Sequence, residues 1–305
     1  MIEVTLLGTS CMVPTKERNV SSIYLEYNGE GILFDCGEGT QRQMNIANIP
    51  RTRVKKIFIS HWHGDHVSGI LGLLQTIGNS VDDHSLEIFG PVETKKRFNY
   101  LMKSTSFSKG NREENLKVAI NESKAPKLTK IYENEHYLIE AISLDHNIPT
   151  LGFSFIEKDR LRIQVSKTKK LGIPDGPVLG KLQQGKDIVF KDKKYKAEDL
   201  TYVVKGKKIT ILMDTSYTKN AILLAKDADI LISEATYLDK HLDRGEKYKH
   251  LTMKQAAQIA HNANVNKLVM VHISQRYKEK EELESEARDI FPNSYLGFDL
   301  MKIKL

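Results

Sequence analysis

The sequence HWHGDH places His61, His63, Asp65 and His66 within six positions, directly after KKIFIS, a short apolar run typical of a buried strand. In an extended chain, residues i and i+2 point the same way, so His61 and His63 can face one ion. Gly64 lets the chain turn, which directs Asp65 and His66 at a second point. The fold must therefore bring these four side chains together in the turn that follows a buried strand.

The donor set indicates the chemistry of this turn. Imidazole and carboxylate groups suit zinc or a similar first-row ion, and two ions about 3.5–4 Å apart around one hydroxide form a hydrolytic centre. The chain has two cysteines, Cys11 and Cys36, which are too few for a closed four-thiolate zinc site or a disulfide framework. A histidine-rich surface turn is the alternative, and four ligating residues after one strand make it the weaker one.

Further candidate ligands follow three later strand-like runs. They are His146 in LDH, Asp214 in MDT and His272 in VHI. Such loops can converge on one edge of a sheet, which would supply the seven or eight ligands that two ions need. The alternative for Asp214 is a turn or capping residue, and Asp145 can orient His146 without touching an ion.

The order of elements predicts two sheets between layers of helices. Short β-rich runs precede helical patterns in the first half of the chain, and the same order returns after residue 208. One helix is expected over 67–78, with Gly78 as its stop. Another is expected over 252–264, where Thr252 and Gln255 form a capping box.

Positive charge is concentrated in one stretch. The formal net charge is +7, and residues 157–208 hold fifteen Lys or Arg against seven Asp or Glu. This stretch is rich in Gly and Pro and has little apolar periodicity, so we expect an excursion from the core. The excess charge either keeps a loop solvated or binds an anionic partner.

Nine motifs together resemble the metallo-β-lactamase superfamily and, within it, the ribonuclease Z family of tRNA 3′-endonucleases. They are LLGTS, FDCGEGTQRQM, HWHGDH, LDH, GIPDGPVLGKLQQG, MDTSYT, SEATY, HLT and VHISQRY, and they span nearly the whole chain. The resemblance implies an α/β fold, a four-layer αββα sandwich. It also implies one metallo-β-lactamase domain over 1–305, with a flexible, protruding basic tRNA-binding arm inserted at 157–205.

The resemblance also implies a ligand set for two Zn²⁺ ions per subunit, with Mn²⁺ or another divalent ion as the alternative. The first ion would be bound by His61, His63 and His146, the second by Asp65, His66 and His272, and Asp214 would bridge both. Asp65 would also be catalytic, because one carboxylate oxygen can accept a hydrogen bond from the attacking water and hold it in line with phosphorus.

Glu234 in SEATY and His250 in HLT match the positions that the family uses to protonate the leaving group. A glutamate paired with a histidine keeps the imidazolium form and orients it. The chain departs from the family pattern on either side of this pair. Ser233 replaces a common histidine, and Leu251 replaces a common serine or threonine.

The arm implied by the resemblance would bind precursor tRNA through its phosphates, without reading sequence. The residues predicted to bind RNA are Lys158, Arg160, Arg162, Lys167, Lys169, Lys170, Gly176, Pro177 and Lys181. The family is commonly homodimeric, so we expect a homodimer. The start of the chain lacks a signal-peptide pattern and no apolar run is long enough to span a bilayer, which predicts a cytoplasmic protein without a membrane partner.

The expected activity is removal of the 3′ trailer of precursor tRNA by a cut after the discriminator base, which leaves a 3′-hydroxyl. One alternative is another hydrolase of the same fold that acts on a small phosphodiester or thioester. A second is a non-catalytic RNA-binding protein, and a third is exonuclease activity at the same site. All seven ligand positions are filled, which argues against the non-catalytic alternative.

Overall fold

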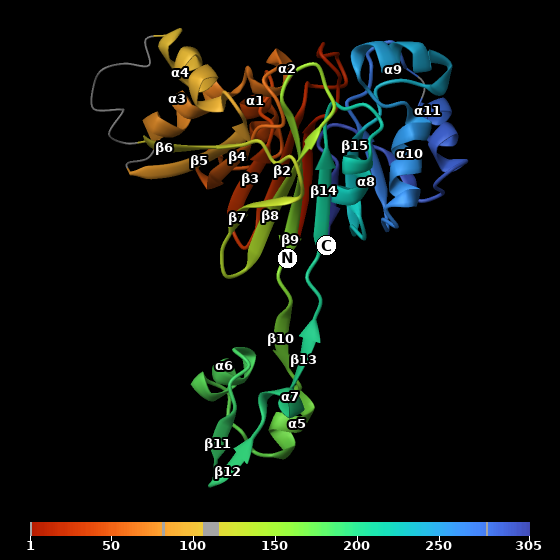
Figure 1. Ribbon diagram of the computed structural model, residues 1–305. Helices are drawn as coiled ribbons and strands as arrows, with labels where there is room; N and C mark the ends of the chain where they lie inside the picture. Colours follow the sequence, from red (N-terminus) through yellow and green to blue (C-terminus); the bar gives the residue numbers. More distant parts are fainter. Residues whose placement is uncertain (1, 81–82, 106–115, 279) are drawn as a thin grey trace. The chain divides into compact units, whose positions relative to one another are not determined.

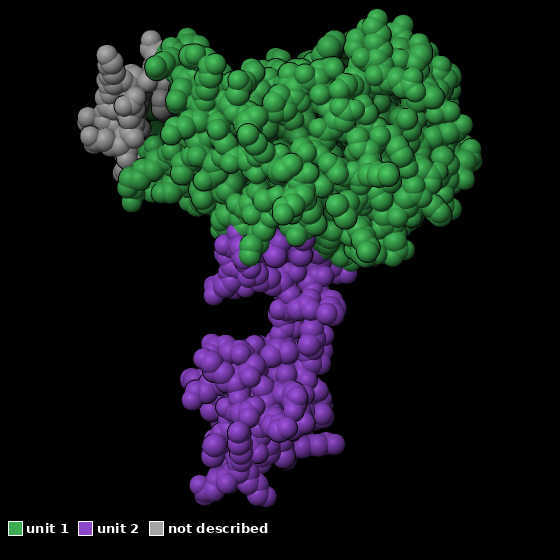
Figure 2. All heavy atoms as spheres, in the orientation of Figure 1, with its two compact units in different colours: residues 1–132, 139–155, 208–305 green, residues 133–138, 156–207 purple. Residues whose placement is uncertain are grey.

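The computed structural model describes residues 2–80, 83–105, 116–278 and 280–305. The chain divides into two compact units (Figure 2). The first unit comprises Met1–Tyr132, Ile139–Phe155 and Lys208–Leu305, and the second comprises Glu133–Leu138 and Ile156–Lys207. Across the described residues, none of the helices has the length and apolar character needed to cross a bilayer.

The first large sheet has the strand order β18-β1-β2-β3-β4-β5-β6. Its amino-terminal strands pair antiparallel, whereas β3, β4, β5 and β6 are parallel neighbours. Its strands are β1 (Ile2–Gly8), β2 (Ser22–Tyr27), β3 (Glu30–Phe34), β4 (Val54–Phe58), β5 (His84–Pro91), β6 (Leu116–Ser123) and β18 (Lys302–Lys304).

The second large sheet has the order β17-β16-β15-β14-β9-β8-β7, and β14 to β17 are parallel neighbours. Its strands are β7 (Thr129–Glu133), β8 (Tyr137–Leu144), β9 (Thr150–Glu157), β14 (Lys208–Leu212), β15 (Ile230–Glu234), β16 (Leu268–Val271) and β17 (Ser294–Leu296).

Helices lie beside both large sheets (Figure 1). Those that follow strands of the first sheet are α1 (Thr40–Ile46), η1 (Arg51–Arg53), α2 (Gly64–Val67), α3 (Ile70–Ser80) and α4 (Thr94–Lys103). Those that follow strands of the second are α8 (Lys219–Ala225), η2 (Asp239–His241), α9 (Leu242–Tyr248), α10 (Met253–Asn262) and α11 (Lys280–Arg288). Each sheet shares a separate apolar core with its helices.

Aromatic rings fill the space between the two sheets. Phe58 of β4 stacks on Phe89 of β5 with ring centroids 4.7 Å apart, and it meets Phe153 of β9 edge-on at 5.5 Å. Phe34 of β3 lies 6.0 Å from Phe153. Because these rings join strands of different sheets, the sheets pack face to face with helices outside. The predicted αββα sandwich is confirmed.

Parallel strands bring the chemistry-bearing loops together. The ends of β3 and β4 carry Asp35 and His61, and the ends of β14, β15 and β16 carry Asp214, Glu234 and His272. The carboxyl ends of parallel strands share one edge of a sheet, where ligand sites form in α/β folds.

The helix predicted over 67–78 was wrong in its bounds. The structure has a short α2 and a separate α3, which continues through Gly78 to Ser80. Gly78 is buried within α3. A glycine that packs in a helix cannot be told from a terminating glycine by composition.

The second unit has its own small fold. Its strands form two antiparallel pairs, β10 (Arg160–Ile163) with β13 (Thr201–Val204) and β11 (Ile188–Phe190) with β12 (Lys193–Tyr195). Its helices are α5 (Val165–Lys170), α6 (Pro177–Gln183) and α7 (Ala197–Leu200). One apolar cluster in this unit buries Ile173, Leu182, Ile188, Ala197 and Leu200.

Candidate active site

The first donor set gathers His61, His63, His146 and Asp214. His61 and His63 lie in the loop after β4, and His146 lies in the loop after β8. His61 Nε2 is 2.9 Å from His63 Nδ1, and His146 Nε2 is 3.3 Å from the same atom. One ligand atom from each of the four residues lies within 4.8 Å of the others, as a single ion requires.

The second donor set gathers Asp65, His66 and His272. The short helix α2 carries the first two, and the loop after β16 carries His272. Asp65 Oδ2 lies 3.4 Å from His66 Nε2 and 3.5 Å from His272 Nε2. These three ligand atoms also lie within 4.8 Å of one another.

Asp214 lies between the two sets with one oxygen toward each. Its Oδ2 is 3.5 Å from His61 Nε2, and its Oδ1 is 3.4 Å from His66 Nε2 and 3.2 Å from His272 Nε2. Burial would raise the pKa of Asp214, but the surrounding imidazoles outweigh burial and hold that pKa well below its usual value. The carboxylate is therefore ionised, as a metal ligand must be.

Three buried atoms of this group have no hydrogen-bond partner in the described part of the chain. They are His66 Nε2, His272 Nε2 and Asp214 Oδ1. Buried polar atoms are almost always paired, because an unpaired one costs about 1–3 kcal/mol. Nitrogen and carboxylate donors that converge on one another without a hydrogen bond fit a divalent cation in its ordinary coordination chemistry.

Asp35, which the sequence analysis missed as a site residue, supports two of the histidines. Its Oδ2 accepts a hydrogen bond from His66 Nδ1 at 2.7 Å and another from the Ser60 hydroxyl at 2.7 Å. The same hydroxyl lies 3.0 Å from His61 Nδ1. A partner on Nδ1 directs Nε2 at the ion. The signal was available in FDCGEG, where an aspartate follows an apolar strand.

Two further histidines, His272 and His146, have Nδ1 partners in loops that follow strands of the second sheet. His272 Nδ1 lies 3.0 Å from the Thr236 hydroxyl, and His146 Nδ1 lies 3.0 Å from the backbone oxygen of Lys249. The carboxylate of Asp145, a candidate for orienting His146, pairs with Lys249 at 2.7 Å.

Glu234 and His250 form a buried pair beside the donor sets. His250 Nδ1 lies 3.1 Å from Glu234 Oε1, which also accepts a hydrogen bond from the Thr215 amide at 2.8 Å. Burial would lower the pKa of His250, but Glu234 and then Asp214 outweigh burial and raise it to about 9. Glu234 thus favours the protonated form of the imidazole, and the pair forms although Ser233 and Leu251 depart from the family pattern.

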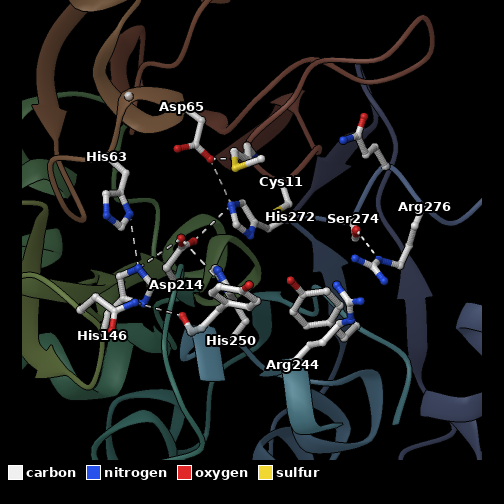
Figure 3. Close-up of a pocket in the computed structure, with 16 residues that line it drawn as sticks. Cys11, His63, Asp65, His146, Asp214, Arg244, His250, His272, Ser274 and Arg276 are labelled. Atoms are coloured by element: carbon white, nitrogen blue, oxygen red, sulfur yellow. Dashed lines mark hydrogen bonds and ion pairs between the residues drawn. The ribbon is translucent and has the colours of Figure 1, made fainter. Parts of the chain in front are cut away.

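A cavity of about 650 Å³ opens onto this group. Figure 3 shows Asp65, His63, His146, Asp214, His250 and His272 around one space, with Arg244 and Arg276 beside it. Arg276 lies over the Tyr237 ring, 5.3 Å from its centroid, and donates to the Ser274 hydroxyl. Arginines in the same cavity as the donor sets favour an anionic substrate such as a phosphodiester.

The residues predicted to bind RNA all lie in the second unit, and some are already engaged. Lys158 pairs with Glu133, Arg160 pairs with Glu157, and Lys167 donates to a backbone oxygen. Among the predicted RNA-binding residues, the exposed cations with neither an ion pair nor a side-chain hydrogen bond in the described part of the chain are Arg162, Lys169, Lys170 and Lys181. Gly176 has φ 135° and precedes Pro177, the first residue of α6.

The two facing sheets, their outer helices and the donor sets define a metallo-β-lactamase-fold protein. The family model described as "Metallo-beta-lactamase superfamily" matches residues 15–137. Among solved structures, the metallo-beta-lactamase fold protein YhfI from Bacillus subtilis is 17% identical, with a TM-score of 0.69 and full coverage of both chains. That level of identity supports the fold alone.

Curated relatives give the narrower assignment. Ribonuclease Z of Microcystis aeruginosa is 38% identical over 98% of this chain and 95% of its own length. Ribonuclease Z of Methanothermobacter thermautotrophicus is 37% identical over 100% and 97%. Human tRNase Z, short form, is 28% identical, with a TM-score of 0.71 and coverage of 99% and 98%. The chain belongs to the ribonuclease Z family.

Proposed function

We propose that the protein is a metal-dependent endoribonuclease that removes the 3′ trailer from precursor tRNA. The cut would fall after the discriminator base and leave a 3′-hydroxyl on the tRNA. The observation that carries the proposal is Asp214, whose two oxygens face two separate donor sets. Full-length similarity to ribonuclease Z proteins supports the substrate.

We propose two Zn²⁺ ions as the cofactor. His61, His63 and His146 would hold one, Asp65, His66 and His272 the other, and Asp214 both. When bound, such ions activate a water molecule at neutral pH and neutralise charge on the phosphate. Imidazole and carboxylate donors also accept Mn²⁺, so ion identity is a question for metal analysis.

Asp65 would position the attacking water. The Met12 amide donates to Asp65 Oδ2 at 2.9 Å, the same oxygen that faces His66 and His272. Burial would raise the pKa of Asp65, but His272 and His66 outweigh burial and hold it well below its usual value. The carboxylate is therefore a hydrogen-bond acceptor that can orient a water proton.

His250 would hold the proton for the departing 3′ oxygen, and Glu234 would orient it. His250 lines the cavity, whereas Glu234 is buried behind it. The imidazolium thus faces the substrate while its counter-charge is shielded from water. General acid catalysis of this kind contributes about 10²–10⁴-fold.

We propose that the second unit, which contains the 157–205 segment, is the tRNA-binding arm. Arg162, Lys169, Lys170 and Lys181 are its best candidates for phosphate contacts, because no carboxylate in the described chain competes for them. Gly176 and Pro177 would shape the adjoining turn. A homodimer stays a proposal based on the family resemblance, and light scattering tests it. A cytoplasmic location stays a prediction from the sequence.

The test is cleavage of an end-labelled precursor tRNA with a 3′ trailer, with the cut mapped to the nucleotide. The reaction is run with added zinc or manganese, after chelation, and with Asp65→Ala. A single metal-dependent cut after the discriminator base, lost in the variant, is expected. Intact RNA together with rapid hydrolysis of a small phosphodiester would move the protein to a different hydrolase class, and stepwise shortening would indicate an exonuclease.

A further inference from the structure

Lys249 occupies a constrained backbone position between α9 and α10. It has φ 57° and ψ 57°, the left-handed conformation that residues with a side chain seldom adopt. The turn is closed by the amide of the next residue, His250, which donates to Gly245 at 2.9 Å. Lys249 therefore immediately precedes the proposed acid, at a point where the chain direction is fixed.

The backbone oxygen of Lys249 accepts a hydrogen bond from His146 Nδ1 at 3.0 Å. This contact places the proton of the His146 ring on Nδ1 and leaves Nε2 free for the first donor set. A ligand's orientation depends on such a partner. The carbonyl group of Lys249 thus acts on a metal ligand that lies 103 residues away in sequence.

The side chain of Lys249 reaches back to the residue before that ligand. Its Nζ lies 2.7 Å from Asp145 Oδ1, within both hydrogen-bond and ion-pair distance. Asp145 is anchored independently, because its backbone oxygen accepts from the Ser216 amide at 2.8 Å. The loop of His146 and the loop of His250 are therefore joined through both the backbone and the side chain of Lys249.

We propose that Lys249, paired with Asp145, is a positioning residue that fixes the metal ligand His146 and the acid His250 relative to each other. The ion pair holds the backbone of Lys249 where its oxygen meets His146 and where its successor meets Glu234. Loss of the pair lets the two loops separate. The inference rests on the proposed function for the role of His250, but not for the effect on metal binding.

A contact between Lys249 and an RNA phosphate is the competing interpretation. The lysine side chain is 36% exposed, but its ammonium already faces a carboxylate. The cavity is lined by its neighbours Tyr248 and His250, and Lys249 is absent from that lining among the described residues. The structure therefore favours a role inside the protein over a role in RNA binding.

The experiment compares Asp145→Asn, Lys249→Met, the double variant and Lys249→Arg with the wild type. Lys249→Gly is added because glycine keeps the carbonyl and adopts the left-handed conformation without strain. Lys117→Met is the matched control, since Lys117 forms an exposed 2.6 Å pair with Asp83 on another part of the first unit. Three quantities are measured: zinc affinity by calorimetry, single-turnover cleavage rate, and affinity for precursor tRNA.

Asp145→Asn, Lys249→Met and Lys249→Gly should each lower zinc affinity and cleavage rate by about tenfold, the lower end of the effect of a residue behind a metal ligand. RNA affinity should not change, the double variant should be no worse than either single variant, and Lys249→Arg should recover most of the loss. Lys117→Met should match the wild type.

Weaker RNA binding in Lys249→Met but not in Asp145→Asn would overturn the proposal and identify Lys249 as an RNA contact. Losses that multiply in the double variant would show that the two residues act separately, and unchanged zinc affinity would remove the link to His146. A wild-type protein that binds zinc but leaves precursor tRNA intact would contradict the proposed function alone. The zinc measurements would still test whether the Lys249–Asp145 pair positions His146.

Discussion

Asp214 contributes to both donor sets, so its charge should matter more than that of any single histidine. In Asp214→Asn the shape is kept, but the amide offers one neutral oxygen in place of two charged ones. We expect the metal content of purified protein to fall and cleavage to drop by more than about 100-fold, above the range seen for residues behind a ligand. Atomic emission and the RNA assay measure the two effects. Wild-type metal content in the variant would refute the bridging role.

His84 offers a pH test away from the metal site. It lies on β5, buried, with Nε2 2.8 Å from the Val54 backbone oxygen and Nδ1 3.3 Å from Lys55 Nζ. Burial, reinforced by Lys55, lowers the pKa of His84. The unfolded chain therefore binds a proton at a higher pH than the folded chain, so stability is lost as pH falls below about 6.5.

Comparison with His84→Gln isolates this contribution. Glutamine can donate to the same backbone oxygen but does not titrate. Between about pH 8 and pH 5, the free energy of unfolding of the wild type should fall more than that of the variant. Chemical denaturation at a series of pH values provides the measurement. Parallel pH dependence of the two proteins would show that His84 does not contribute.

At the scale of single elements, the capping box of α10 is confirmed. Thr252 accepts from the Gln255 amide at 3.2 Å, and the Gln255 side chain accepts from the Thr252 amide at 3.0 Å. Thr252→Ala should lower the free energy of unfolding by about 1 kcal/mol. Thr252→Ser keeps the capping hydroxyl and should retain most of that stabilisation. Denaturant titration distinguishes the two, and equal losses would mean that the methyl group, rather than the hydroxyl, stabilises the helix.

Sequence patterns predicted α10 because its signals are local. They also predicted two sheets between layers of helices, since apolar periodicity and the order of elements along the chain can be read locally. Asp35 and Lys249 escaped notice for the opposite reason. Asp35 meets His66, 31 residues away, and Lys249 meets His146, 103 residues away. Such contacts depend on how loops converge in three dimensions, which periodicity does not encode. The small core of the second unit was missed because its apolar residues are few and irregularly spaced.

At the scale of the whole molecule, the chain enters and leaves the second unit at neighbouring points. The amide of Glu157 donates to the backbone oxygen of Lys207 at 2.9 Å, so a short glycine linker can replace residues 158–206. The shortened protein should bind zinc and hydrolyse a small phosphodiester as well as the wild type does. The KM for cleavage of precursor tRNA should rise. An unchanged KM for RNA would mean that the unit only supplies solvated charge.

A variant that removes positive charge but keeps the second unit tests how much its cations contribute to RNA binding. Replacing Arg162, Lys169, Lys170 and Lys181 with glutamine should weaken RNA binding and reduce the salt dependence of the binding constant. For four phosphate contacts, the slope of log affinity against log salt should fall by about 3. Filter binding at several salt concentrations measures this slope. Lys158→Gln, which removes a cation already paired with Glu133, should change it least.

The donor sets draw on both large sheets: His61, His63, Asp65 and His66 follow a strand of the first, and His146, Asp214 and His272 follow strands of the second. A bound ion therefore fastens the two halves of the sandwich to each other. Since ligands that bind only the folded state stabilise it, metal starvation would increase the unfolded fraction that proteases remove. The supply of metal to a cell would then govern how long each copy of this protein survives, as well as whether it cuts RNA.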